Sequence, residues 1–441
     1  MPPFLGAARA VLPPLLFVLL SVSAVVPVRL DAQADSGAVG RTIARLAALA
    51  RESDPTLRLA RARELAAERL VTSAGSVPPL AAAFGLSDGP RGDVMRGNAS
   101  IEVGRGLFLG SRLVAARATA RGELAIEIRE RRVAEEVIEV RVTDLVTNGV
   151  AAERALTRLR QSEQLLVDAE EALAVRLAAG TGRYSDVLRV RAERLAVGFS
   201  IRDELANRAS VRAQLLTTAG APLHADSLDR WMAEAAMAMT AGSAWRSTLA
   251  SLPSTDSLAA LSEIVRDAAT VRVRAEARRT QGIAARRPEV NGAIGLQRIG
   301  AANGGPSAGV LVGISSTLPF SARRANERST QVENAEVVAA EAGVTAAMGR
   351  ARPGLEGLRE RLKAALERLE AIDAVVLVAA GSEREAALAE FRAGALTLLE
   401  LLDFERSLLR VELERSDALR EAASLRASLF GITPFASGAR P

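Results

Sequence analysis

The sequence lacks several residue types on which enzymes and metal proteins depend. Among its 441 residues there are no cysteines, one histidine (His224) and one lysine (Lys363), and only 3% of the residues are aromatic. Without cysteine the chain has no disulfide, no thiolate ligand, no thiol nucleophile and no acylation site for a lipoprotein anchor. A single histidine gives neither a histidine metal site nor a Ser-His-Asp arrangement. We therefore expect no metal site, no cofactor and no enzymatic activity.

A concentrated basic patch is also missing. Charged residues make up 25% of the chain and the net charge is +5, but the two signs alternate along the sequence. Nucleic-acid binding needs a basic stripe with aromatic stacking residues, and neither is found. The glycines at Gly104, Gly106 and Gly110 lack the lysine and the spacing of a phosphate-binding loop. We expect no nucleic-acid or nucleotide partner.

Only the N-terminus carries a long apolar run. Arg9 precedes the apolar stretch Val11–Val28, and Ala32-Gln33-Ala34 then forms a small-x-small cleavage site. This pattern predicts a signal peptide, residues 1–34, that is cleaved after Ala34. The alternative is a membrane anchor, which the prolines in the run disfavour. No later stretch has the length and apolarity of a transmembrane helix, so the mature chain either stays outside the bilayer or crosses it as strands.

What the sequence does contain points to long helices. Apolar residues make up 49% of the chain and are mostly Ala, Leu and Val. Between Leu113 and Ala178 there is no proline, and leucines and valines recur at steps of three, four and seven, as in a coiled-coil seam. Such a helix is a rod of roughly 100 Å, too long for a globular domain to bury. Shorter return helices are expected over about Ser185–Thr218 and Thr397–Phe430. In the second unit Pro353 marks either a kink or an insertion.

An internal duplication organises the chain. Ala209–Leu216 resembles Ala423–Phe430, and Thr56–Leu59 resembles Thr270–Val273, each pair 214 positions apart. Each unit reads as an amphipathic helix (Thr42–Ser73 or Leu258–Arg286), two strands, a long helix, a glycine turn and a second helix. The predicted divisions are the signal peptide at 1–34, the first repeat at 35–222, an inter-repeat linker or equatorial segment at 223–256, the second repeat at 257–432 and a C-terminal tail at 433–441.

Four segments alternate apolar and polar residues with the period of a strand. They begin near Leu80, Ile101, Val290 and Val310, and each is about ten residues long, enough for a tilted strand to cross a bilayer. Ordinary soluble hairpins are the alternative. Four strands do not close a barrel, and open edges in lipid leave backbone groups unpaired, so insertion requires several copies of the chain. Three copies would supply twelve strands.

The two glycine turns carry a family resemblance. The segments Arg176–Leu188 and Phe391–Asp403 resemble the helical tips of TolC-like outer membrane efflux proteins, and the resemblance covers about Thr42–Ile432. It implies a mainly α fold with a small β part, in which two repeats of long antiparallel coiled-coil helices carry four strands per protomer. A homotrimer would form a 12-stranded transmembrane β-barrel in outer-membrane lipid, above a periplasmic tunnel. The implied partners are a periplasmic adaptor protein and, indirectly, an inner-membrane pump.

The same resemblance implies two groups of site residues. The residues expected to contact the adaptor are Arg176, Gly180, Ser185 and Gly394. The candidates for the pore constriction are Glu400, Asp403 and Asp186. The first two of these carboxylates would form threefold rings that attract cations, although they are equally explained as solvated charges on a helix surface. Leu396 stands where some relatives have an arginine, which weakens the case for a salt bridge from that position to Asp186.

The predicted function is the outer-membrane channel of a tripartite efflux system, a passive conduit that exports small molecules or metal ions. One alternative is a periplasmic coiled-coil structural or adaptor protein that does not insert in the membrane. An adaptor carries one helical hairpin with small β-domains, whereas this sequence predicts two hairpins and four separate strands, so the channel is favoured. A second alternative, within the same class, is the outer-membrane duct of a type I protein secretion system.

Overall fold

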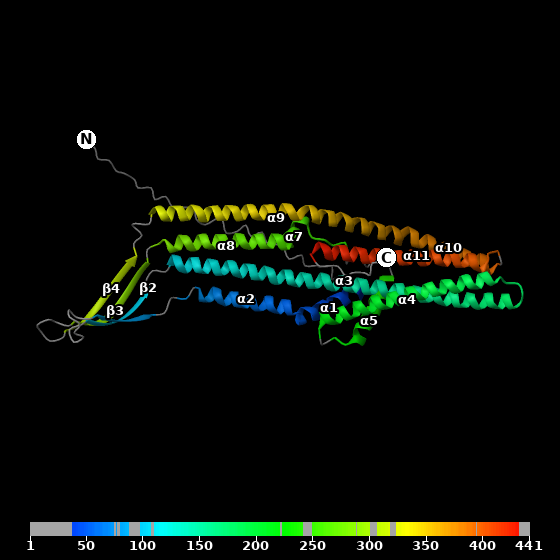
Figure 1. The fold of residues 1–441 in the computed structure, drawn as a ribbon, viewed down its shortest axis with the longest axis horizontal. Helices are drawn as coiled ribbons and strands as arrows, with labels where there is room; N and C mark the ends of the chain where they lie inside the picture. The colour runs from blue at the N-terminus through cyan, green and yellow to red at the C-terminus, as the bar shows by residue number, and fades with distance from the viewer. Residues whose placement is uncertain are drawn as a thin grey trace, which may run out of the picture.

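The protein is a long helical rod with a small sheet at one end and two helical tips at the other (Figure 1). The computed structural model describes residues 38–74, 76, 80–87, 98–106, 110–220, 223–240, 249–287, 289–299, 307–317, 323–393 and 395–431. The predicted signal peptide, Gly394 and the C-terminal tail lie outside the described residues.

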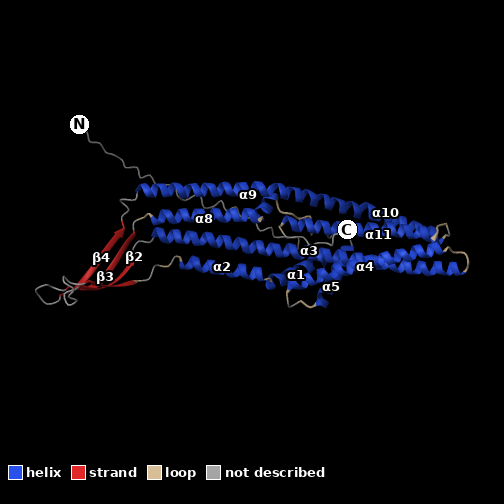
Figure 2. Cartoon of the chain, in the orientation of Figure 1, coloured by secondary structure: helices blue, strands red, loops and turns tan. Residues whose placement is uncertain are grey.

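The first repeat contains α1 (Ala38–Ser53), α2 (Pro55–Ser73), β1 (Ala81–Ser87), β2 (Asn98–Gly106), α3 (Gly110–Ala178) and α4 (Tyr184–Ala219). The segment after it holds α5 (Ala225–Thr240). The second repeat contains α7 (Thr255–Leu261), α8 (Glu263–Ala285), β3 (Glu289–Ile299), β4 (Ser307–Thr317), α9 (Arg323–Ala371), α10 (Leu377–Arg392) and α11 (Leu398–Leu429). Figure 2 shows the strands gathered at one end and helices along the rest. The predicted fold class, two helical repeats with four strands, is confirmed.

The helix at the start of each repeat is broken, so the prediction of one continuous amphipathic helix was wrong in both units. In the first repeat Pro55 lacks the amide that a helix interior needs, so α1 ends before it and α2 begins at it. Asp54 is extended, and its side chain accepts hydrogen bonds from the amides of Thr56 at 2.7 Å and Leu57 at 3.1 Å. In the second repeat an extended residue, Ser262, separates α7 from α8.

Pro353 does not interrupt the second long helix. It lies inside α9, which continues to Ala371, and Figure 1 shows this helix bending gradually towards α10. The departure from α-helical geometry comes later, in a π-helical turn at Ile372–Val376 that joins α9 to α10. A π-turn inserts one residue into the helical repeat and shifts the faces of the helix beyond it.

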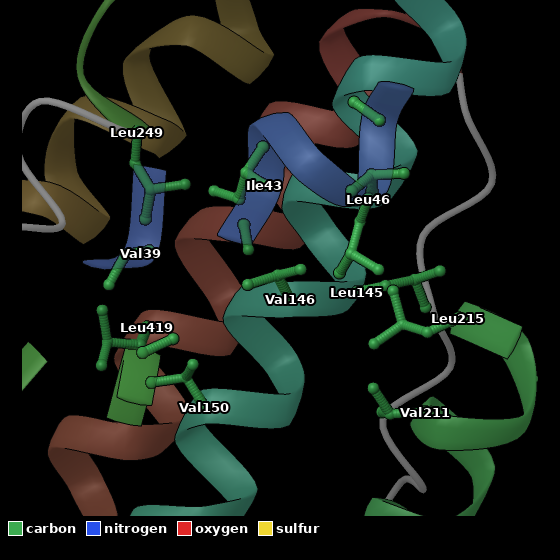
Figure 3. Close-up of a cluster of buried hydrophobic side chains, with 14 of the residues drawn as sticks. Val39, Ile43, Leu46, Leu145, Val146, Val150, Val211, Leu215, Leu249 and Leu419 are labelled. Atoms are coloured by element: carbon green, nitrogen blue, oxygen red, sulfur yellow. The ribbon is translucent and has the colours of Figure 1, made fainter. Parts of the chain in front are cut away.

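The main hydrophobic core lies where the two repeats meet near the middle of the rod. Figure 3 shows α1 residues Ile43 and Leu46 against Leu145 and Val146 of α3. The core is completed by side chains of α4, α9 and α11, among them Leu215, Leu362 and Leu419, all buried. Each such side chain contributes about 1.5–3 kcal/mol on burial.

The segment expected to be an inter-repeat linker is part of this core. It forms α5, which packs against α1 and α3. Leu228, Met232 and Ala235 of α5 are buried in the central cluster. The guanidinium of Arg45 stands 5.6 Å from the centre of the Trp231 ring. The apolar residues of α5 are at helical spacing and hold α1, the first helix of the first repeat, in place.

The cap of α2 gives a first prediction. Partial burial acts to raise the pKa of Asp54, but hydrogen bonds from Thr56 and Leu57 outweigh it and leave the pKa below its ordinary value. Replacing Asp54 by Ala removes the cap, which costs about 1 kcal/mol, so amides at the start of α2 should exchange with solvent about fivefold faster. Hydrogen exchange measured by mass spectrometry checks this.

The control for this experiment is Asp54→Asn, which keeps a capping oxygen and should leave exchange nearly unchanged. In the unsubstituted chain the charged cap is fully present above the unfolded pKa of about 3.9 and is lost as pH falls through the lower folded value. Equal exchange in the Ala and Asn variants would contradict the assignment of Asp54 as the cap.

Candidate functional site

The four strands form one antiparallel sheet with an exposed apolar face. Their order is β1-β2-β3-β4, and the register aligns Phe84, Ile101, Leu296 and Val310 in one row across all four strands. Aligned residues share a face of the sheet. The next row on this face contains Ala82, Val103, Ile294 and Val312, and Ile314 follows on β4. These side chains are exposed, and Val310, Val312 and Ile314 are 71–75% exposed.

The opposite face of the sheet carries mainly small or polar residues, with Leu311 as a large apolar one. One row across it contains Gly85, Ser100, Gln297 and Gly309, and the next contains Ala83, Glu102, Gly295 and Leu311. Glu102 is the single ionisable residue among the described side chains of this face. A Cβ at Gly295 would stand 2.8 Å from the Glu102 Cγ and 2.5 Å from the Ile101 carbonyl oxygen, so only glycine leaves room for the carboxylate side chain there.

Both outer strands of the sheet are open within this chain. In the described sheet β1 pairs only with β2, and β4 pairs only with β3. Each therefore presents unpaired backbone groups on its outer side. Such groups need water or another strand, and in an apolar medium only another strand will serve.

The first tip is a tight turn between α3 and α4. Gly180 has φ 74°, a left-handed conformation that favours glycine, and this explains the residue at that position. The carbonyl of Arg176 accepts hydrogen bonds from the amides of Thr181 and Gly182, both at 3.0 Å. The predicted adaptor-contact residues Arg176, Gly180 and Ser185 are all exposed at this turn, so the structure brings them together.

The second tip is closed by a capping box at the start of α11. The amide of Thr397 donates to the Glu400 Oε2 at 2.8 Å, and the amide of Glu400 donates to the Thr397 Oγ1 at 3.3 Å. Hydrogen bonds from the backbone and side chain of Thr397 lower the pKa of Glu400 below its ordinary value. Glu400 is therefore an exposed, ionised side chain that also caps its helix, a role that the sequence analysis missed although the Thr-x-x-Glu pattern signals it.

Asp403 belongs to a charge network that joins the two hairpins. It pairs with Arg406 one turn further along α11, and Arg406 also binds Glu193 of α4. A second arginine of α4, Arg189, has its Nη2 3.9 Å from the Asp403 Oδ1. Asp186, the third predicted constriction residue, lies half-buried in the first turn of α4. Arg406 and Glu193 were missed because their sequence spacing carries no sign of the contact.

Behind the tips, charged side chains are buried between the hairpins. Arg415 of α11 binds Asp373 of the π-turn, with its Nη2 3.1 Å from the Asp373 Oδ2. Burial lowers the pKa of Arg154 on α3 to about 10, and the positive charge of Arg415 adds to this effect. Arg420 of α11 binds Glu204 of α4 at 2.6 Å. Because a buried charge is costly without its partner, the Arg420–Glu204 pair fixes how the two hairpins sit against each other, and the Arg415–Asp373 pair fixes α11 against the π-turn of its own hairpin.

Two further observations concern the described residues only. Their helices include none with the length and apolarity needed to cross a membrane. Their His, Asp and Glu side chains form no group of three that is placed to hold a metal ion.

Comparison with solved structures identifies the fold. The open state of the MtrE outer membrane channel of Neisseria gonorrhoeae is 19% identical, with a TM-score of 0.60 over 88% of this chain and 88% of that one. The outer membrane protein VceC of Vibrio cholerae is 19% identical, with a TM-score of 0.59 over 90% and 97% of the two chains. The outer-membrane channel OprN is 18% identical, with a TM-score of 0.59 over 89% and 91%.

No model of a known protein family matches the sequence, and no curated protein sequence matches it either. The similarity is thus carried by the structure. This chain has the fold of TolC-like outer-membrane channels, as the resemblance of its two tips predicts.

The capping box at the second tip gives a prediction. Thr397→Ala removes the two hydrogen bonds of the Thr397 hydroxyl, one donated to the Glu400 Oε2 at 2.7 Å and one accepted from the Glu400 amide at 3.3 Å, and keeps the bond donated by the backbone amide of residue 397. The pKa of Glu400 should therefore rise part of the way towards its ordinary value, and the first turn of α11 should exchange its amides faster. In the unsubstituted chain the contribution of the lowered pKa is present above about pH 4.3 and is lost as pH falls through the folded value.

Hydrogen exchange of the peptide containing Leu398–Leu402 measures the effect of Thr397→Ala. Thr280→Ala on α8 is the control, because Thr280 donates only to the Glu276 carbonyl in its own helix at 2.9 Å. If exchange at the tip were the same in both variants, Thr397 would not be the cap.

Proposed function

We propose that this chain is one protomer of a homotrimeric outer-membrane channel that exports small molecules or metal ions as a passive conduit. The observation that carries the proposal is the two-faced sheet with open edges at one end of a helical rod. Its apolar face suits lipid and its small polar face suits a water-filled lumen. The shared fold with outer-membrane channels supports the same conclusion.

Three copies complete what one copy leaves open. Joining the β1 edge of one protomer to the β4 edge of the next pairs the exposed backbone groups and closes a barrel of twelve strands. A barrel of this kind has an even number of strands and an outward apolar band. The rod then continues the conduit on the side of the tips, in the periplasm.

The proposed partners follow from the exposed tips. We propose that Arg176, Gly180, Ser185 and Gly394 contact a periplasmic adaptor, which links the channel to an inner-membrane pump. The signal peptide at residues 1–34, cleaved after Ala34, would bring the chain to this location. An adaptor or structural protein that never inserts is less well supported, because its sheet would have no reason to expose two aligned apolar rows across all four strands. A secretion duct would use the same conduit.

Lipid contact is tested by two neighbouring residues on β3. Leu296 lies on the apolar face and Gln297 on the polar face. An arginine facing lipid near the bilayer centre costs about 2–4 kcal/mol, whereas one facing a lumen costs little. We therefore expect Leu296→Arg to abolish assembly into membranes and Gln297→Arg to preserve it.

The measurement is the amount of heat-sensitive trimer in the outer-membrane fraction, together with conductance of the purified protein in planar bilayers. Equal loss in the two variants would point to a general folding defect, and equal tolerance would show that the sheet does not face lipid. A soluble monomer from the unsubstituted chain would reject the channel.

The carboxylates at the second tip should favour cations at the narrow end of the conduit. Arginines offset the charge of Asp403, whereas Glu400 is held ionised by Thr397. Glu400→Gln should therefore reduce the cation-over-anion permeability ratio more than Asp403→Asn. Gln is also accepted in a capping box, so the fold of the tip is kept.

Reversal potentials in a salt gradient measure this ratio. The control is Glu414→Gln, which removes an exposed carboxylate from the same helix further from the tip. If Glu400→Gln and Glu414→Gln behaved alike, Glu400 would be a solvated surface charge and not part of a constriction.

A further inference from the structure

Four helices make up the half of the rod that carries the tips, and they lie in a fixed order. α10 packs against α11, α11 against α3, and α3 against α4. α10 and α4 are the two ends of this order. The outer helices of the rod thus follow the sheet, in which β1 of the first repeat and β4 of the second are the open edges.

α4 carries a stripe of large exposed side chains. Tyr184, Leu188, Leu195 and Phe199 follow one another at steps of four, seven and four, and they are 44–61% exposed. These steps place them on one face of a helix, with the spacing of a seam between helices. The residues that pack on α3, such as Val190 and Ile201, lie on a different face. A row of four large exposed apolar side chains is typical of a surface that binds a partner.

α10 and the π-turn before it carry a second stripe, which we call the small stripe because four of its six members are Ala or Ser; the other two, Val375 and Val378, are 65% and 64% exposed. Its members are exposed and lie opposite Ala380 and Ala387, which are buried. Small residues leave hollows between helical turns, into which large side chains of another helix fit. The small stripe consists of Val375, Val378, Ala379, Ser382, Ala386 and Ala389.

The two stripes lie at the same height along the rod. Glu193 of α4 binds Arg406 of α11, and the preceding residue of α11, Glu405, binds Arg384 of α10 at 2.6 Å. Glu193 and Arg384 are therefore level. Because α4 runs away from the tips and α10 runs towards them, Leu195 is level with Ser382 and Phe199 is level with Val378.

Most charges beside the stripes are of opposite sign. Arg191 and Arg202 lie on the same side of α4 as the large stripe and both are exposed, although Arg191 also binds Glu170 of α3 at 2.7 Å and the exposed Asp203 lies beside the stripe too. The Arg202 guanidinium stands 5.4 Å from the centre of the Phe199 ring. Glu383, Glu385 and Glu390 lie beside the small stripe of α10 and are exposed as well. Opposite charges flanking an apolar seam fix the choice and orientation of partner helices. Large against small and basic against acidic make the two surfaces complementary.

We propose that the large stripe of α4 packs into the small stripe of α10 of a neighbouring copy of this chain, as an antiparallel seam. This inference rests on the proposed trimer and names the residues through which its copies meet behind the tips. The same neighbour relation joins β1 of one copy to β4 of the next. In this arrangement Leu195 lies against Ser382 of the adjacent copy.

The absence of cysteine allows a direct test, since an introduced cysteine has no native thiol with which to form a disulfide. Leu195→Cys is combined in turn with Ala379→Cys, Ser382→Cys and Ala386→Cys in the full-length protein, in membranes, and oxidised with copper phenanthroline. A disulfide needs Cβ atoms about 3.5–4.5 Å apart, so it reports the register of the seam. The control replaces Leu195→Cys by Ala196→Cys, an exposed neighbour about 100° further round the helix.

We expect a ladder of covalent dimers and trimers that is strongest with Ser382→Cys and is lost with Ala196→Cys or with either single variant. Trimer formation is measured in an independent experiment, in which the mass of the protein is determined in detergent. A trimer without cross-links from Leu195→Cys to any of the three positions would overturn the seam and leave the channel standing. A protein that is monomeric would overturn the channel itself.

Discussion

The constraint on which the structure depends is the hydrogen-bonding need of a strand edge beside an apolar face. β1 and β4 each have an unpaired side, and the same sheet exposes Val310, Val312 and Ile314. Water satisfies the edges but not the apolar face, and lipid satisfies the face but not the edges. Sister strands within a bilayer, as in the proposed trimer, satisfy both at once. The long helices then extend the conduit that the strands of the proposed trimer enclose.

Much of this arrangement is readable from the sequence because its signals are local and periodic. The absence of proline from Leu113 to Ala178 and the steps of its leucines predict α3 nearly to its ends. Alternation at Val310, Val312 and Ile314 predicts β4 and also which face is apolar. The glycine turn at Gly180 follows from the left-handed conformation that the tip requires.

What the sequence could not provide depends on contacts between distant segments. The prolines were poor guides to the helix boundaries. Pro55 begins a new helix where one continuous helix was predicted, whereas Pro353 lies inside a helix where an interruption was predicted. The π-turn has no proline or glycine to announce it, and Asp373 there meets Arg415 only after α11 has folded back. Likewise Glu193 and Arg406 are 213 positions apart, so their pairing at the tips is a product of the fold.

The open β1 and β4 edges bear on how such a protein comes into being. In the proposed trimer, a newly made chain carries its apolar face and its unpaired strand edges until two other copies bind, so the sheet of a single protomer is prone to aggregate. The fraction of protomers with a completed sheet then depends on the protomer concentration, because the completed sheet forms only in the assembled trimer. Assembly would thus complete the sheet, whereas the helical core is already buried within one chain.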